Sequence, residues 1–181
     1  MSIKTDEWIR MMGEQGMITP FEPSQVRKGV VSYGLSSMGY DFRLDDEFFV
    51  PTSEYLLNPK YQTGGRTVKQ AQYILNAGEF VLGKSIEYFR MPDDVIGICY
   101  GKSTYARLGV QLNMTPIEPG WCGHMTICIS NIGYGAVVLY AYEGIGQITF
   151  HQAENVPLLT YAAKQGKYQD AQGIMVARVE D

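Results

Sequence analysis

Short runs of apolar residues alternate with polar and turn-forming residues along most of this chain. The runs are rich in β-branched and aromatic side chains, and Gly, Pro and Asn separate them. This pattern is typical of short strands joined by turns, and it predicts an all-β barrel or sandwich. The expected strands are 30–32, 40–44, 73–81, 95–100, 124–131, 136–141 and 146–151.

The first residues follow a helical pattern instead. Thr5 is suited to cap a helix, and Asp6 and Glu7 fall in the first turn, where negative side chains complement the helix dipole. Apolar side chains recur at helical spacing between residues 8 and 12, and Gly16 ends the pattern. We expect this short helix to be the longest in the chain.

Two polar stretches are expected to lack regular structure. Residues 55–69 contain Asn-Pro and Gly-Gly pairs, and residues 164–172 form a polar tail that contains a glycine. The sequence contains no internal repeat and no linker long enough to separate two domains. Because 181 residues suit one domain, we expect residues 1–181 to form a single unit.

Composition and charge narrow the range of functions. The net charge of −4 argues against a general nucleic-acid binder, and no run of about 18 apolar residues predicts a membrane span. The three cysteines form no C-x-x-C pair, and the first residues lack the apolar segment of a secretion signal. We therefore expect reduced thiols, a cytoplasmic protein, and neither a nucleic-acid nor a membrane partner.

A basic, hydroxyl-rich segment that reads G-K-S-T-Y-A-R begins at Gly101. Lys102 supplies a cation, and Ser103 and Thr104 supply hydroxyl groups. Arg107 lies one helical turn after Ser103, so the two face one side if the segment coils. Backbone amides, cations and hydroxyls are the groups that bind phosphate oxygens. The alternative is a basic turn between strands that binds nothing.

A rigid, proline-flanked loop that reads T-P-I-E-P-G-W carries Glu118 and Trp121. A carboxylate held in such a loop can bind a sugar hydroxyl or activate a water molecule. The alternative is a solvent-facing glutamate beside a core tryptophan.

Zinc-dependent deamination is not supported by the sequence. That chemistry needs an H-x-E segment and a P-C-x-x-C segment to hold the metal. His124 and His151 are followed two positions later by Thr126 and Ala153, and no C-x-x-C segment occurs.

Several segments, in order along nearly the whole chain, resemble the dCTP deaminase branch of the dCTP deaminase/dUTPase superfamily. They are S-I-K-T-D-E-W-I-R at 2–10, V-S-Y-G-L-S-S-M-G-Y-D-F-R at 31–43, S-I-E-Y-F-R-M-P at 85–92, G-K-S-T-Y-A-R-L-G at 101–109, T-P-I-E-P-G-W-C-G at 115–123, E-G-I-G-Q-I-T-F at 143–150 and G-K-Y-Q-D-A-Q-G at 166–173. The resemblance implies a distorted, dUTPase-like β-barrel and a homotrimer with active sites between subunits. It also implies a bound pyrimidine deoxynucleoside triphosphate with Mg²⁺ and no zinc.

The resemblance also implies roles for individual residues. Lys102, Ser103 and Thr104 fall on the phosphate-binding segment, with Ser103 also beside the reacting base. Arg107 falls on the arginine that supports the reaction centre electrostatically. Glu118 matches an acidic residue that contacts the deoxyribose, at the position of the water-activating aspartate of the dUTPases. The remaining substrate-binding candidates are Trp121, Gln147, Tyr161, Lys167 and Gln172.

One segment, T-I-C-I-S-N at 126–131, departs from the family pattern T-L-E-[IF]-S-N. The resemblance implies that the glutamate replaced by Cys128 shuttles protons during deamination. Deamination at C4 of cytosine needs a base to deprotonate water and an acid to protonate N3. A thiol with an ordinary pKa of about 8.5 is mostly protonated at neutral pH, so it is a poor substitute base. Cys128 therefore indicates a disabled enzyme, a changed reaction or an unusual active deaminase.

The sequence thus supports three functional hypotheses. The leading one is a dCTP deaminase that converts dCTP and water to dUTP and ammonia, with Cys128, Arg107 and Ser103 at the catalytic centre. The second is a pyrophosphohydrolase that cleaves dUTP or dCTP with water activated by Glu118. The third is a nucleotide-binding protein without turnover.

Overall fold

The computed structural model describes residues 2–52, 58–60 and 64–177. Two helices occur in these ranges, α1 (Asp6–Glu14) and α2 (Ser103–Ala106). The strands are β1 (Ser2–Ile3), β2 (Ile18–Thr19), β3 (Gly34–Ser36), β4 (Gly39–Pro51), β5 (Gly65–Lys69), β6 (Gln72–Leu75), β7 (Phe80–Arg90), β8 (Val95–Gly101), β9 (Val110–Asn113), β10 (Cys122–Asn131), β11 (Val137–Tyr140) and β12 (Gly144–Gln152). The described chain is built mainly from strands, as the apolar pattern predicts.

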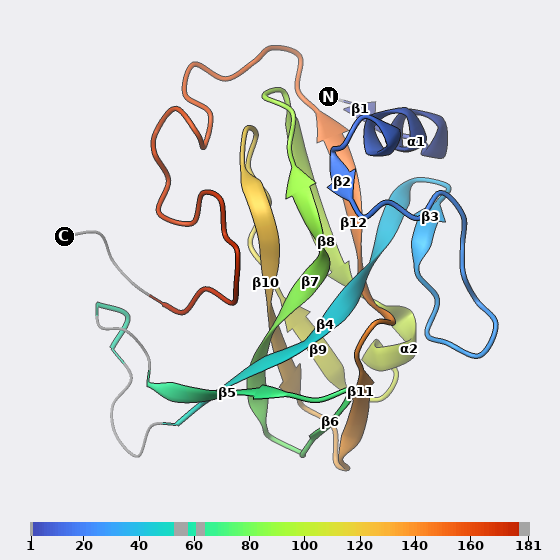
Figure 1. Ribbon diagram of the computed structural model, residues 1–181, viewed down its shortest axis with the longest axis vertical. Coiled ribbons are helices and arrows are strands. Elements are labelled where there is room, and N and C mark those ends of the chain that lie inside the picture. The colour runs from blue at the N-terminus through green and yellow to red at the C-terminus, as the bar shows by residue number, and fades with distance from the viewer. Residues whose placement is uncertain (1, 53–57, 61–63, 178–181) are drawn as a thin grey trace.

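Most of the strands join in one curled sheet that closes about half of a barrel (Figure 1). Its main path runs β1, β12, β4, β7, β10, β9, and four more strands pair at its sides. The long strand β4 causes the curl, because its first part pairs with β12 while its later part pairs with β7 and β5. The expected mainly β fold with a distorted, barrel-like sheet is confirmed.

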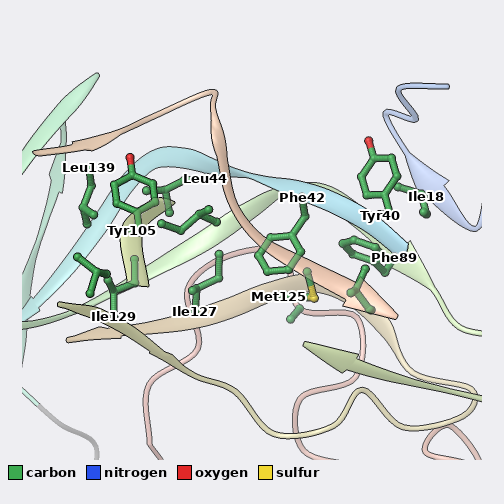
Figure 2. Close-up of a cluster of buried hydrophobic side chains, with 14 of the residues drawn as sticks. Ile18, Tyr40, Phe42, Leu44, Phe89, Tyr105, Met125, Ile127, Ile129 and Leu139 are labelled. Carbon is green, nitrogen blue, oxygen red and sulfur yellow. The ribbon is translucent and has the colours of Figure 1, made fainter. Parts of the chain in front are cut away.

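The hydrophobic core fills the inside of this curl. Met125, Ile127 and Ile129 of β10 are at most 1% exposed, and they lie in one cluster with Phe42 and Leu44 of β4 (Figure 2). Successive side chains of a strand point to opposite faces. The intervening side chains of β10 therefore point away from the core, toward the last segment of the chain, which runs beside β10 in orange and red in Figure 1.

The N-terminal helix is confirmed as the longer of the two described helices. Thr5 precedes it in an extended conformation but makes no capping hydrogen bond with its side chain, and Asp6 and Glu7 lie in its first turn. Neither helix in the described ranges is long and apolar enough to cross a membrane.

Two of the predicted strands are wrong in detail. Residues 30–32 form no strand, and the backbone N–H of Val31 donates instead to the Glu143 carboxylate at 2.6 Å. The predicted strand 73–81 is two strands, β6 and the start of β7. A turn separates them, in which Gly78 has a φ of 76° and the Glu79 carboxylate accepts from the backbone N–H of Asn76 at 2.7 Å.

The prediction of an irregular stretch at 55–69 is also wrong at its end. β5 occupies Gly65–Lys69 and pairs with β4, although its side chains are mostly exposed and polar. Residues 53–57 and 61–63 of the same prediction lie outside the described residues. The strand β9 and the later part of β7 were not predicted. Strand β9 is too short a run, and the later part of β7 carries too few alternating apolar residues, to be recognised by pattern alone.

Candidate functional site

A cavity of about 890 Å³ lies on the face of β10 that points away from the core. Strand β10 forms its floor, and residues 113–118 and the tail from Tyr161 to 177 form its walls. The predicted site residues among its lining are Glu118, Trp121, Cys128, Tyr161 and Lys167. The structure thus brings five of the candidates together, although Tyr161 and Lys167 lie far along the chain from Cys128.

Cys128 lies on the floor of this cavity, half-buried, between Leu82 of β7 and Asn113 of β9. Burial raises the pKa of the Cys128 thiol above its ordinary value. The thiol is therefore neutral near pH 7. In this state the sulfur can donate a proton, but it does not act as a base.

The tail is attached to β10 and to the adjoining loop by hydrogen bonds. The indole Nε1–H of Trp121 donates to the backbone carbonyl of Tyr168 at 2.9 Å. Farther along, the backbone N–H of Met175 donates to Thr126 Oγ1 at 2.9 Å. The tail therefore forms a wall of the cavity with an ordered position, and Trp121 serves both as a wall and as an anchor.

Glu118 lies at the cavity wall in an ion pair with Lys164 of the tail. Both side chains are about two-fifths exposed, at 43% and 41%. Lys164 also lies over the ring of Tyr161, with Nζ 5.1 Å from the ring centre. Lys164 was not among the predicted site residues. Its partner is 46 positions away, so no local motif in the sequence marks the pair.

His124 also lines the cavity, although it was not among the predicted site residues. Its Nδ1 lies 3.0 Å from the backbone carbonyl of Ser85, and its ring contacts the ring of Tyr88 edge-on at 5.3 Å. Because a carbonyl oxygen only accepts, Nδ1 carries the hydrogen in this contact. His124 is on the same face of β10 as Cys128 but four residues away, which is about 13 Å along a strand.

The basic segment coils as expected and forms α2. The backbone N–H and the Nη1 of Arg107 both donate to the carbonyl of Ser103, at 3.2 and 3.3 Å. Ser103, Thr104 and Arg107 are all exposed. The segment therefore presents two hydroxyls and a guanidinium to its surroundings rather than to the core.

Lys102 and Gln147 are brought together by a residue that was not predicted. The ammonium of Lys102 forms an ion pair with Asp41, and the Gln147 amide donates to Asp41 Oδ1 at 2.9 Å. Gln172, by contrast, donates to the carboxylate of Asp170 at 2.7 Å within the tail and is not among the residues that line the cavity.

The candidates thus form two groups that do not share a cavity within one chain. Cys128 is paired with Asn113, whereas Asn131 at the end of β10 is paired with Val110. Three residues of strand span about 10 Å, and Arg107 lies beyond Val110, so the guanidinium and the thiol are at opposite ends of this ladder. The basic segment with Gln147 forms one group, and the cavity with its tail forms the other.

In the described ranges no three His, Cys, Asp or Glu side chains are gathered closely enough to hold a metal ion. Mg²⁺ prefers oxygen ligands and usually keeps several waters, so phosphate oxygens of a bound nucleotide can supply most of its other ligands.

Known proteins are similar to this chain in both sequence and fold. Residues 3–153 match the family model described as dCTP deaminase-like. A dCTP deaminase of Acidobacterium capsulatum is 47% identical over 183 residues, covering 99% of this chain and 100% of that protein. One from Nautilia profundicola is 47% identical over 185 residues, with the same coverage of both chains. The crystal structure of the 2′-deoxycytidine 5′-triphosphate deaminase from Agrobacterium tumefaciens has a similar fold, with a TM-score of 0.65 at 17% identity over 83% of this chain and 48% of that one.

Proposed function

This chain belongs to the dCTP deaminase-like family, and on that premise we propose that it hydrolyses dCTP to dUTP and ammonia. The observation that carries the proposal is 47% identity, over the full length of both chains, to proteins named dCTP deaminase. The cavity supports it, because about 890 Å³ is within the usual range of small-molecule sites. The protein is accordingly a deaminating hydrolase that acts on a nucleotide.

The pyrophosphohydrolase and binding-only hypotheses are not favoured by the comparisons. Both would require a function different from that of relatives that match this chain end to end. Glu118, which the pyrophosphohydrolase hypothesis needs as a base for water, is paired with Lys164. The ammonium of Lys164 occupies one oxygen of that carboxylate.

The separation of the two residue groups supports a site shared between subunits. Ser103, Thr104 and Arg107 are exposed on α2, while the cavity that holds Cys128 contains no arginine among its described lining residues. A homotrimer in which α2 of one subunit meets the cavity of the next would complete each site. The three free cysteines support a cytoplasmic location for this assembly.

In the completed site, we assign triphosphate binding to Lys102, Ser103 and Thr104. Their ammonium and hydroxyl groups donate to phosphate oxygens, and the tail residues Tyr161 and Lys167 contribute from the cavity side. Bound Mg²⁺ would neutralise part of the triphosphate charge.

The chemical step makes the role of Cys128 decisive. The oxygen of water bonds to C4, one water proton is accepted and delivered to N3, the second water proton passes to the N4 amino group, and the C4–N4 bond breaks as ammonia leaves. One carboxylate at position 128 can accept the first proton and deliver it. Cys128 can accept the water proton only in its minor thiolate form, because burial raises its pKa, while Ser103 and Arg107 orient the base and the attacking water. We therefore propose an intact deaminase site with a weak proton carrier.

Product analysis tests the assigned reaction. The protein is incubated separately with dCTP and with dUTP in the presence of Mg²⁺, and ammonia and pyrophosphate are measured. Ammonia from dCTP with no pyrophosphate from either nucleotide is expected. Pyrophosphate as the main product would replace this proposal with the hydrolysis of the phosphate chain.

A further inference from the structure

A buried carboxylate on β4 has no role in the reaction as assigned above. Asp41 is 4% exposed, and three side chains donate to it. They are the ammonium of Lys102, the amide of Gln147 at 2.9 Å, and the amide of Gln25 at 3.0 Å. The three donors come from separate parts of the chain, so Asp41 is the point at which they meet.

Both oxygens of Asp41 are used in this arrangement. Oδ1 accepts from Gln147, and Oδ2 accepts from Gln25 and Lys102. A buried ion pair adds little net stability, because desolvation offsets most of its Coulomb attraction. A buried carboxylate with three donors does fix the geometry of those donors. The arrangement therefore indicates a role in orientation more than one in stability.

The backbone around Asp41 holds the same arrangement in register. Gln147 of β12 lies directly opposite Asp41 of β4, and the backbone N–H of Lys102 donates to the carbonyl of Ile145 in β12 at 3.1 Å. Gly39 leaves room for Gln147, because a Cβ at position 39 would lie 3.1 Å from the Gln147 side chain. Lys102 and Gln147 are thus fixed by both their backbone and their side chains.

Each of these side chains keeps polar groups available. An ammonium has three donors, and the contact with Asp41 accounts for one of them on Lys102. The Gln147 amide donates from Nε2, which directs its carbonyl oxygen away from the carboxylate. The Lys102 side chain is 12% exposed, and Lys102 is the residue that directly precedes α2.

We propose that Asp41 is a positioning residue of the nucleotide site, which holds the Lys102 ammonium and the Gln147 amide in one fixed arrangement for an anionic triphosphate. This role rests on the proposed assignment of Lys102 to phosphate binding. Asp41 itself does not touch the nucleotide. Its carboxylate sets where the two donors point before the nucleotide arrives, which lowers the entropic cost of binding.

The substitution Asp41→Asn tests the proposal with two measurements. It keeps the shape of the side chain but replaces a carboxylate oxygen with an amide nitrogen, whose N–H groups cannot accept from the three donors. Calorimetry with Mg²⁺ should show dCTP binding weakened by roughly 10- to 100-fold, the size expected for disruption of a charged hydrogen bond, with deoxycytidine binding unchanged. Acetylation of Lys102, followed by mass spectrometry, should become several-fold faster than in the parent.

The matched control is Asp45→Asn on the same strand. Asp45 also pairs with a lysine, Lys84, at 3.8 Å, but it lies outside both residue groups of the site. This variant should bind dCTP like the parent, and its Lys102 should be acetylated at the parental rate. If Asp41→Asn fails to fold, Asp41→Glu keeps the charge but moves it, and weaker dCTP binding with unchanged deoxycytidine binding is then expected.

The outcomes separate this role from the proposed function. Unchanged acetylation of Lys102 in Asp41→Asn would mean that Asp41 does not hold the ammonium, and the proposal would be wrong. The same conclusion follows if Lys102→Ala weakens dCTP binding while Asp41→Asn does not, or if any Asp41 variant weakens dCTP and deoxycytidine equally. If Lys102→Ala itself leaves dCTP binding unchanged, the phosphate assignment fails and the role of Asp41 fails with it.

Discussion

Cys128 shows at the scale of one residue how a strand position and its surroundings determine chemistry. The family resemblance implies that Cys128 replaces a proton-shuttling carboxylate. The structure places its thiol on the floor of the cavity. Burial then raises its pKa, so its neutral form persists to higher pH than that of an exposed cysteine. No feature of the sequence alone gives the direction of that shift, because it depends on neighbours from β7, β9 and the tail.

The direction of this shift predicts slow alkylation of Cys128. Thiolate is the reactive form, and burial disfavours it, so at about pH 8 Cys128 of the folded protein should react with iodoacetamide at least several-fold more slowly than in urea. The rate should rise as the pH is increased through the raised pKa. Peptide mass spectrometry measures this at Cys128 alone, and equal rates in folded and unfolded protein would show that the site does not shield the thiol.

Other residues of the site could not be found from the sequence for a physical reason. Asp41 and Lys164 act through partners 61 and 46 positions away, and neither belongs to a local motif with an expected chemistry. The basic segment and Glu118 could be named as candidates, because their chemistry is contained in a few adjacent residues. What the structure adds is which carboxylate faces which cation.

In strand β10, side chains that point alternately to the two faces of the sheet contribute to both the core and the cavity. Its buried residues alternate with half-buried ones along its whole length. The sequence predicts this strand nearly to its ends, because alternation is strong there. It does not predict β5, whose side chains are exposed and polar, and it merges β6 with β7, since the turn between them depends on a side-chain hydrogen bond to Glu79.

The alternation predicts effects of different size for neighbouring substitutions. Ile127 is fully buried, so Ile127→Ala should lower the free energy of unfolding by about 2–5 kcal/mol. Cys128→Ala, one residue along, removes a half-buried sulfur on the other face and should cost well under half as much. Urea unfolding of the two variants measures the difference, and equal losses would contradict the assignment of faces.

The division of candidate residues into two groups matters at the scale of the whole molecule. The basic segment on α2 and the cavity beside the tail lie at opposite ends of the β9–β10 ladder. The homotrimer implied by the family resemblance unites them, and it stays a prediction. If two subunits share each site, one subunit alone does not bring these candidate residues together.

If each site is shared between two subunits, two variants with defects in different residue groups should complement each other in mixed trimers. Arg107→Ala and Glu118→Ala alter different groups, so homotrimers of either should bind dCTP weakly at every site. Mixed trimers, made by unfolding and refolding the two together, should regain parental affinity at a fraction of their sites. Light scattering should give three times the 20.3 kDa of one chain. Absence of any recovered site in a mixture of confirmed trimers would place both groups in one subunit's site.

The rate of ammonia release from dCTP, compared between the parent and Cys128→Glu, tests the central claim most directly. If the site is an intact deaminase site with a weak proton carrier, restoring a carboxylate should raise the rate by roughly 10²–10⁴-fold, which is the usual contribution of a positioned acid–base group. The affinity for dCTP should change much less. No ammonia from either protein, while both bind dCTP with Mg²⁺, would contradict the account.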